Sequence, residues 1–283
     1  MFVRGAPTAR QSRFGTELRK LRERAGLSAT EVGRLLGVRQ AQISNMEAAR
    51  FGVSPERIRT LAHHYSCTDA RLIDALVDMA ARRERGWWEE YRDILPAALL
   101  DLAELDHHGK ALRTGHTSHI PGLLQVPEHA REIFRNTVPA YTAPEIEHRV
   151  SHRIKRQSIL HRAAPAPYRA VIHEAALRMQ FGGAAVQKRQ LRHLLDMSEY
   201  EHITLRVIPY AAGAYPGAGQ AIYYVHGPVP QLDTVQLDQS HGPVLIDAEA
   251  ELDVYRHVLD RMEAIALPEA ATREFIHDIA HHL

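Results

Sequence analysis

The stretch Leu27–Arg50, LSATEVGRLLGVRQAQISNMEAAR, decides the fold of the N-terminal part of this 283-residue chain. Ser28, with Glu31 three residues later, has the spacing of a capping box, which predicts that a helix begins there. Gly37 permits a sharp turn at the end of that helix. A further helix is predicted from about residue 40 to residue 48, so the stretch is expected to form two short helices joined by a tight turn.

The flanking sequence supplies the rest of a small helical bundle. Apolar residues at i, i+4, i+7 and i+11 predict a preceding helix, which Gly26 is placed to end. Ser54-Pro55, with proline at the first helical position, predicts a following helix. Gly33 leaves room for a close approach of two helices. The residues expected to face inward are Phe14, Leu18, Leu21, Ala25, Val32, Leu35, Leu36, Ile43, Met46, Ile58, Leu61, Ala62 and Tyr65.

The charges of the chain are unevenly distributed. The net charge is only +1, from 35 Lys and Arg against 34 Asp and Glu. Residues 1–67 hold 12 basic and 5 acidic residues, a net charge of +7, which leaves 23 basic and 29 acidic residues, or −6, for residues 68–283. A basic segment on an acidic remainder favours contact with a polyanion, although an arginine-rich solvated surface would give the same count.

The helix predicted after Gly37 offers the side chains that reading of DNA requires. Glutamine and asparagine can bond both N6 and N7 of adenine in the major groove, and short serine and alanine allow close approach and contact with a thymine methyl group. The side chains expected to be exposed on this helix are Gln40, Ala41, Gln42, Ser44 and Asn45. Phosphates would be held by flanking groups, for which the candidates are Ser28, Thr30, Arg39, Gln42 and Arg50.

These features resemble the helix-turn-helix of the Xre (Cro/C1-type) family of DNA-binding proteins. The resemblance covers residues 12–66 and is carried by Leu27-Ser28, a small residue at position 33, Leu36-Gly37-Val38, Ile43-Ser44 and Glu47. It implies that the base-reading residues are Gln40, Ala41, Ser44 and Asn45. Many family members carry glutamine at the position of Ala29, where it braces a base-reading glutamine and a phosphate, and this chain lacks that brace.

The same resemblance implies an oligomeric state and a DNA partner. Family members usually pair two such domains and place their recognition helices one DNA turn, about 34 Å, apart. We therefore expect a homodimer that binds a palindromic operator in double-stranded DNA.

The sequence predicts that the whole chain divides into four parts. A flexible tail is predicted at residues 1–11, the helix-turn-helix domain at 12–81, a charged linker at 82–86, and a regulatory, dimerisation or partner-binding domain at 87–283. In the last part, residues 87–162 are mostly helical in pattern, and helices are also predicted at 184–198, 247–266 and 269–281. Strand-like runs occur at 168–172, 203–208, 221–225, 233–237 and 244–246. The predicted class is α+β, an all-α N-terminal domain followed by a helix-rich domain with a small, mainly antiparallel sheet.

Several segments between residues 87 and 265 resemble an actinobacterial family of WhiJ-like, antitoxin-like regulators, which carry a C-terminal domain of unknown function after an Xre domain. The segments are Trp87–Tyr91, Ile120–Gln125, Arg149/Arg153/Arg156-Gln157, Glu174–Leu177 and Ile208–Gly213. The resemblance implies transcription control in development or specialised metabolism, often with a small partner protein encoded nearby.

The same segments also have explanations that need no family. Trp88 and Tyr91, three residues apart, would share a helix face, either as a core aromatic cluster or as a ligand cage. Arg149, Arg153 and Arg156 fall at i, i+4 and i+7 as one basic stripe, which is either a solvated face or a holder for a phosphate or a partner's carboxylates. Ile120–Gln125 combines a turn with an apolar pair, which either packs a loop before a helix near residue 127 or binds a partner.

No catalytic constellation emerges from the sequence, so the protein is predicted not to be an enzyme. His173-Glu174 begins like the zinc motif HExxH, but Leu177 occupies the position of the second histidine. The 19 histidines show no complete ligand spacing, so they are expected to be ordinary surface residues, with no metal and no cofactor. A single cysteine, Cys67, no apolar run of about 18 residues and no secretory signal together favour a cytoplasmic, nucleoid-associated protein without membrane contact.

Two functional hypotheses remain at this point. The first is a sequence-specific DNA-binding transcriptional regulator whose C-terminal domain senses a small-molecule effector or a protein partner. The alternative is an antitoxin-like interaction protein that binds a small partner protein and autoregulates its own operon. Candidate residues for the ligand or partner are Trp88, Tyr91, Arg149, Arg153 and Arg156.

Overall fold

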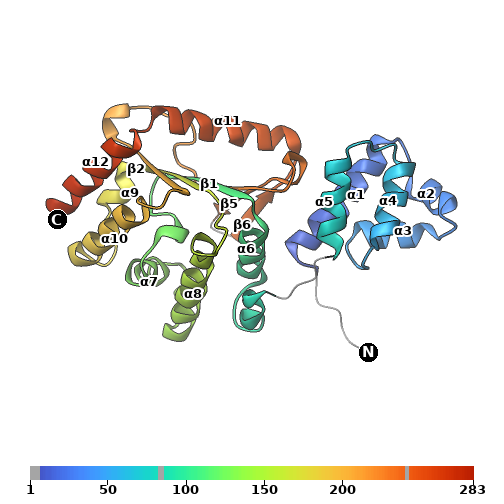
Figure 1. Ribbon diagram of the computed structural model, residues 1–283. Helices are drawn as coiled ribbons and strands as arrows, with labels where there is room; N and C mark the ends of the chain where they lie inside the picture. Colours follow the sequence, from blue (N-terminus) through green and yellow to red (C-terminus); the bar gives the residue numbers. More distant parts are fainter. Residues whose placement is uncertain (1–6, 82–85, 240–241) are drawn as a thin grey trace. The chain divides into compact units, whose positions relative to one another are not determined.

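A computed structural model describes residues 7–81, 86–239 and 242–283 of the chain, and Figure 1 shows its helices and strands. The chain forms two compact units, one of Met1–Arg92 with Pro96–Leu105 and one of Asp93–Leu95 with Asp106–Leu283. The boundary between them therefore lies beyond the predicted linker, of which residues 82–85 fall outside the described part. Among the described residues, no helix has both the length and the apolar character needed to cross a membrane.

The first unit contains the predicted helical bundle. Its helices are α1 (Ala9–Arg24), α2 (Ala29–Leu35), α3 (Gln40–Glu47), α4 (Pro55–His64) and α5 (Ala70–Ala81), followed by the 3-10 helix η1 (Trp87–Tyr91) and by α6 (Ala97–His108), which ends in the second unit. The prediction of a flexible tail up to residue 11 is wrong for its last residues. Thr8 caps α1 and Gln11 completes a capping box with it, so the helix begins at Ala9.

Most of the predicted core of the bundle is confirmed. The buried members of the predicted set are Phe14, Leu18, Leu21, Val32, Ile43, Ile58, Leu61, Ala62 and Tyr65. Leu35 is a clear error, since 53% of its surface is exposed. The helix α2 has only seven residues, of which Val32 and Gly33 are buried. Leu35 lies outside this narrow buried face.

The second unit is built on one six-stranded mixed sheet. Its strands are β1 (Ala111–His116), β2 (Tyr168–His173), β3 (Ile203–Ile208), β4 (Ile222–His226), β5 (Thr234–Gln239) and β6 (Gly242–Ile246). Their order is β3-β2-β1-β4-β5-β6. The pairings β1–β2 and β2–β3 are parallel, and β1–β4, β4–β5 and β5–β6 are antiparallel. The class α+β is therefore confirmed, with parallel strands in one half of the sheet.

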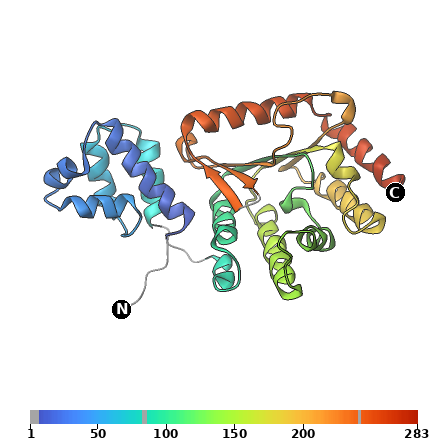
Figure 2. The same cartoon turned by 180° about the vertical axis from the view of Figure 1, so that it is seen from behind.

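Helices cover both faces of this sheet (Figures 1 and 2). The helix α11 (Glu249–Ile265) lies along one face, and α7 (Pro127–Arg135), α8 (Ala143–Arg156) and α10 (Ala184–Met197) lie on the other. The remaining elements are α12 (Glu269–His281), the single-turn helix α9 (Glu174–Arg178), and the 3-10 helices η2 (Gly122–Leu124), η3 (Gln157–Leu160), η4 (Tyr210–Ala212) and η5 (Pro230–Leu232). Leu252, Leu259 and Met262 of α11 form a buried core with residues of β2 to β5.

The strand β1 was missing from the prediction, although it lies in the middle of the sheet. Its sequence, ALRTGH, has few apolar residues, because its polar side chains are satisfied inside the protein. Arg113, only 6% exposed, reaches Glu263 and Asp260 of α11 at 2.8 and 2.7 Å. Since adjacent side chains of a strand point to opposite faces, His116 points away from α11, toward the layer that holds α7 and α8.

Candidate nucleic-acid interface

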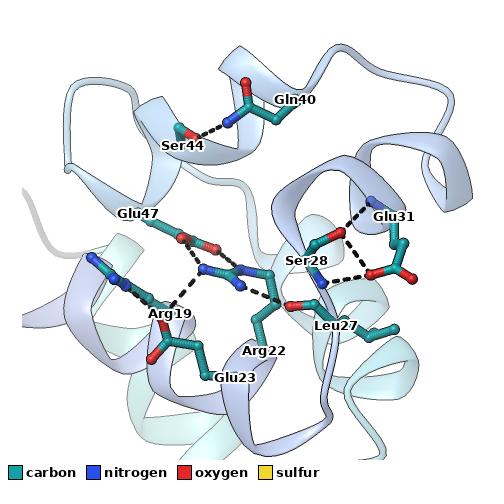
Figure 3. A network of polar contacts seen from close by, with 9 residues as sticks. All are labelled: Arg19, Arg22, Glu23, Leu27, Ser28, Glu31, Gln40, Ser44 and Glu47. Carbon is teal, nitrogen blue, oxygen red and sulfur yellow. Dashed lines mark hydrogen bonds and ion pairs between the residues drawn. The ribbon is translucent and has the colours of Figure 1, made fainter.

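The turn between α2 and α3 has the geometry that the sequence predicted. Ser28 Oγ accepts a hydrogen bond from the backbone N–H of Glu31, and the Glu31 carboxylate accepts one from the backbone N–H of Ser28, so the capping box is present (Figure 3). The Ser28 hydroxyl and then the Ser28 backbone N–H, which both donate to the Glu31 carboxylate, lower the pKa of Glu31. Gly37 has φ of +65°, a conformation that favours glycine. A Cβ on Gly33 would lie 2.8 Å from the carbonyl oxygen of Val38, which explains the small residue there.

A buried ion pair fixes α3 against α1. Arg22 donates from Nε and Nη2 to the two carboxylate oxygens of Glu47, at 2.7 and 2.9 Å, and from Nη1 to the carbonyl oxygen of Leu27 at 2.8 Å (Figure 3). Both side chains are about nine-tenths buried, and the bidentate contact raises the pKa of Arg22. Because Glu47 is the last residue of α3 and Leu27 lies just before α2, one guanidinium holds both ends of the helix-turn-helix.

The four predicted base-reading residues all reach the surface of α3. Gln40 and Ala41 are exposed, and Ser44 and Asn45 are partly exposed. Gln40 Nε2 donates to Ser44 Oγ at 2.7 Å, one helical turn away (Figure 3). The Ser44 hydroxyl therefore orients the Gln40 amide on this helix. Asn45 Oδ1 accepts a hydrogen bond from Arg50 Nη1 at 3.2 Å, so its amide is also positioned by a neighbour.

The predicted phosphate contacts lie around the two helix starts. Thr30 is exposed in the first turn of α2, and Arg39, Gln42 and Arg50 are exposed at the two ends of α3. The backbone N–H of Arg39 donates to Gln42 Oε1 at 3.1 Å, and Arg39 is exposed at the start of the helix. Ser28 differs from the others, because its hydroxyl and its backbone N–H are both engaged with Glu31.

The predicted basic stripe on α8 is not a solvated face. Arg149 is 7% exposed and stacks on the ring of Tyr141, with 3.7 Å from its guanidinium carbon to the ring centroid. Arg156 is 8% exposed and pairs with Asp106 at 2.7 Å. Arg153 lies between them along the helix and is partly exposed. The three arginines therefore turn into the second unit, and each has its own surroundings.

Trp88 and Tyr91 occupy the 3-10 helix η1 and are 3% and 7% exposed. Trp87 packs edge-to-face against both, with ring centroids at 6.1 and 6.0 Å. This burial favours the aromatic-cluster interpretation over a ligand cage. The two residues belong to the first unit, whereas the arginines of α8 belong to the second.

Several histidines are not the surface residues that the sequence analysis expected. His116, His129 and His152 are 7%, 0% and 2% exposed. The segments Ile120–Gln125 and Arg149–Gln157, which carry the family resemblance, contact each other. Arg153 Nη1 donates to Gln125 Oε1 at 2.7 Å, and Gln157 Nε2 donates to the Gln125 carbonyl oxygen at 2.7 Å. No local sequence pattern predicts these contacts, because they depend on how α8 packs against the loop at residues 120–126.

Comparison with protein families agrees with this division of the chain. A helix-turn-helix domain model matches residues 13–76, which cover most of α1, all of α2 to α4 and part of α5. The model of a domain of unknown function, DUF5753, matches residues 99–278. No curated protein and no solved structure gives a match. Since the second match extends over more than half of its length, the chain belongs to the DUF5753 family, with a helix-turn-helix domain at its N-terminal side.

Proposed function

We propose that this protein is a sequence-specific transcriptional regulator of the Xre type, which binds a palindromic operator as a homodimer. The helix-turn-helix domain indicates DNA binding and regulation. The observation that carries the proposal further is the arrangement on α3, where Gln40, Ser44 and Asn45 present amide and hydroxyl groups on a helix held from behind by Arg22 and Glu47. Rigid presentation of such groups is what direct readout of bases in the major groove requires.

Charge supports the same function. The +7 charge of residues 1–67 lies in the unit that carries α3, so attraction to phosphates adds sequence-independent affinity to the contacts of α3. The second unit, of the DUF5753 family, is proposed to act without catalysis in the cytoplasm, as a WhiJ-like regulatory domain that couples DNA binding to a signal. An effector acts in such a system by binding one arrangement of the paired DNA-binding domains more tightly than another.

Selection of bound fragments from genomic DNA by the full chain tests this function. We expect an enriched palindrome whose half-sites lie one helical turn, about 10 base pairs, apart. In a second round, Gln40→Ala should relax the preference for one base pair in each half-site by ~1–3 kcal/mol, because a bidentate amide–adenine contact is lost.

The matched control is Gln220→Ala, since Gln220 is also an exposed glutamine but lies before β4 in the second unit. It should leave the selected sequence unchanged. Recovery of fragments without a common motif by the unmodified chain would contradict sequence-specific binding.

A further inference from the structure

A cluster of polar side chains lies at the carboxyl end of β1, within the second unit. His116 ends β1, and its Nδ1 lies 3.2 Å from Nδ1 of His119. The strand β1 is the point at which the sheet changes direction, because β2 and β3 follow on one side of it and β4 to β6 on the other. Because β1, β2 and β3 are parallel to one another, their carboxyl ends lie at the same edge of the sheet.

His129, on α7, is a polar side chain that is fully buried. It is 0% exposed, and neither of its ring nitrogens has a hydrogen-bond partner within the described part of the chain. A neutral imidazole carries one donor and one acceptor, and leaving such groups unpaired in the interior costs free energy. The ring packs edge-to-face on Phe181, with centroids 5.2 Å apart. A bound molecule with a polar end would satisfy the nitrogens that the protein leaves unpaired.

Arg153 differs from Arg113 and Arg156 because no carboxylate lies at ion-pair distance from it among the described residues, although Asp238 of β5 acts on it from farther away. Arg113 and Arg156 each pair with an acidic side chain, whereas Arg153 forms no ion pair with any residue that the structure describes. Its Nη1 donates to Gln125 Oε1 at 2.7 Å, and its guanidinium carbon lies 4.2 Å from the centroid of the Phe134 ring. Desolvation, and then the charge of Arg156, lower the pKa of Arg153 to about 10.

The histidines and Arg153 interact electrostatically as one group. Burial is the largest cause that lowers the pKa of His116 and His129, followed for both by the charges of His119 and then Arg153. The pKa of His129 falls to about 4. Arg153 is therefore the cationic group of the cluster and burial disfavours the charged form of the three imidazoles, while the carboxylate of Asp238 on β5 partly offsets the lowering of the pKa of Arg153 and of His119. One charge matches a carboxylate better than it matches a phosphate group, which carries nearly two negative charges.

Buried amides fix the loop beside these residues, and two of the four side chains are partly exposed. Gln125 Nε2 donates to the Ile120 carbonyl oxygen at 2.6 Å, and Gln190 Nε2 donates to that of Leu124 at 2.7 Å, so the loop at residues 120–126 is fixed by buried amides. Arg153 and His119 are partly exposed, whereas His129 is buried. A ligand that contacts the partly exposed Arg153 and His119 would therefore meet donors that are held in place.

We propose that Arg153, His116, His119 and His129 form a binding site for the carboxylate of a small organic acid, whose apolar part lies against Phe134 and Phe181. The guanidinium has donors left for a carboxylate, and His129 gains the partner that it lacks. The four groups come from β1, the loop after it, α7 and α8. That such an acid regulates DNA binding rests on the proposed function, whereas the binding itself does not.

Calorimetric titration of the full chain with benzoate and phenylacetate tests the site. Both acids should bind and raise the melting temperature, whereas benzamide and phenylacetamide, which have the same shape but no charge, should do neither. Arg153→Gln should weaken binding at least tenfold. Arg149→Gln is the matched control, because this arginine lies one turn away on α8 and stacks on Tyr141 instead. Its binding should match that of the unmodified chain.

A second variant separates a binding role from a structural one. His129→Leu removes an unpaired polar group, so the ligand-free protein should melt at an equal or higher temperature, while acid binding is lost. Absence of binding by both acids, equal binding of the amides, equal effects of the two arginine substitutions, or tighter binding of inorganic phosphate would each overturn the proposal. Acid binding that leaves operator affinity unchanged would contradict only the regulatory role, and the site would stand.

Discussion

Arg39 lies where α3 begins and is exposed, next to the residues predicted to read bases. We expect Arg39→Ala to weaken binding to all DNA sequences alike, because a phosphate contact carries no base information. Loss of one such contact should lower the slope of log K against log salt concentration by about 0.9. Fluorescence anisotropy of a labelled operator, titrated between about 50 and 200 mM salt, measures this slope.

The control for this experiment is Arg59→Ala on α4. Arg59 is exposed like Arg39, but it pairs with Asp74 of α5 at 3.1 Å and lies outside the helix-turn-helix. Arg59→Ala removes the same charge from the domain as Arg39→Ala, but at a position away from α3. Its effect on the slope should therefore be smaller. Identical slopes for the two variants would show that Arg39 contributes only to the overall positive charge of the domain and makes no specific phosphate contact.

His129 links burial to the pH dependence of stability. Its pKa is about 4 in the folded protein, below the ordinary value of 6.5. Between these values the unfolded chain binds a proton that the folded protein does not, so the free energy of unfolding falls as the pH decreases from about 6.5 toward 4. For His129 alone this loss is ~2 kcal/mol between pH 7 and pH 4.5.

Urea denaturation at both pH values checks this prediction, with His129→Leu as the comparison. Between pH 7 and pH 4.5, the free energy of unfolding of His129→Leu should fall by ~2 kcal/mol less than that of the unmodified chain. Equal losses would show that His129 keeps an ordinary pKa in the folded protein.

The sequence was sufficient for residues whose role depends on local position, and insufficient for those whose role depends on burial. Gln40, Ala41, Ser44 and Asn45 were predicted to be accessible because a helix with Ile43 inside must turn them outward, and the structure agrees. The burial of His116, His129 and the arginines of α8 comes from packing between elements far apart in the sequence, which the spacing of residues on one helix does not reveal.

At the scale of elements, the ion pair between Arg22 and Glu47 sets how α3 is presented. Arg22→Ala leaves a buried carboxylate without its partner, which we expect to cost ~3 kcal/mol of unfolding free energy in the first unit. The double variant Arg22→Met with Glu47→Leu removes both charges and should recover most of this loss. Urea denaturation followed by circular dichroism measures both.

The two variants also separate stability from positioning. If the pair orients α3, the double variant should fold well but bind the operator less tightly than the unmodified chain, because the guanidinium also holds the Leu27 carbonyl before α2. Full operator affinity in a stable double variant would show that the pair serves folding alone.

Elements differ in how much their own sequence determines them. The helices α2 and α3 carry a capping box and a glycine turn, signals that act within a few residues, and they were predicted correctly. The strand β1 has neither the alternation nor the apolar run of a strand, because Arg113 and His116 point into polar surroundings that other elements provide. The close approach of α1 to α3 at Gly15, where a Cβ would lie 2.2 Å from the Glu47 carbonyl oxygen, was missed for the same reason.

For the whole molecule, the length of the chain and its helix and strand patterns predicted two domains and the α+β class, but not the boundary between the two units. The first unit extends beyond the helix-turn-helix domain to include residues 87–92 and 96–105, whose sequence resembles any other helical segment. The parallel half of the sheet was also not predicted, because it depends on β1 and on the long connections that hold α7, α8 and α10.

Pairing of two chains is the last property that the proposed function requires. A single helix-turn-helix contacts one half-site, and two linked domains gain affinity because the second contact forms within a complex that already exists. Sedimentation of the protein should give twice the chain mass of 31.9 kDa. Insertion of five base pairs between the half-sites turns them to opposite sides of the duplex, so affinity should fall to that of a single half-site. A chain of single mass that binds the palindrome in one step, or affinity insensitive to the insertion, would contradict a paired arrangement and leave base reading by α3 to be explained by one domain alone.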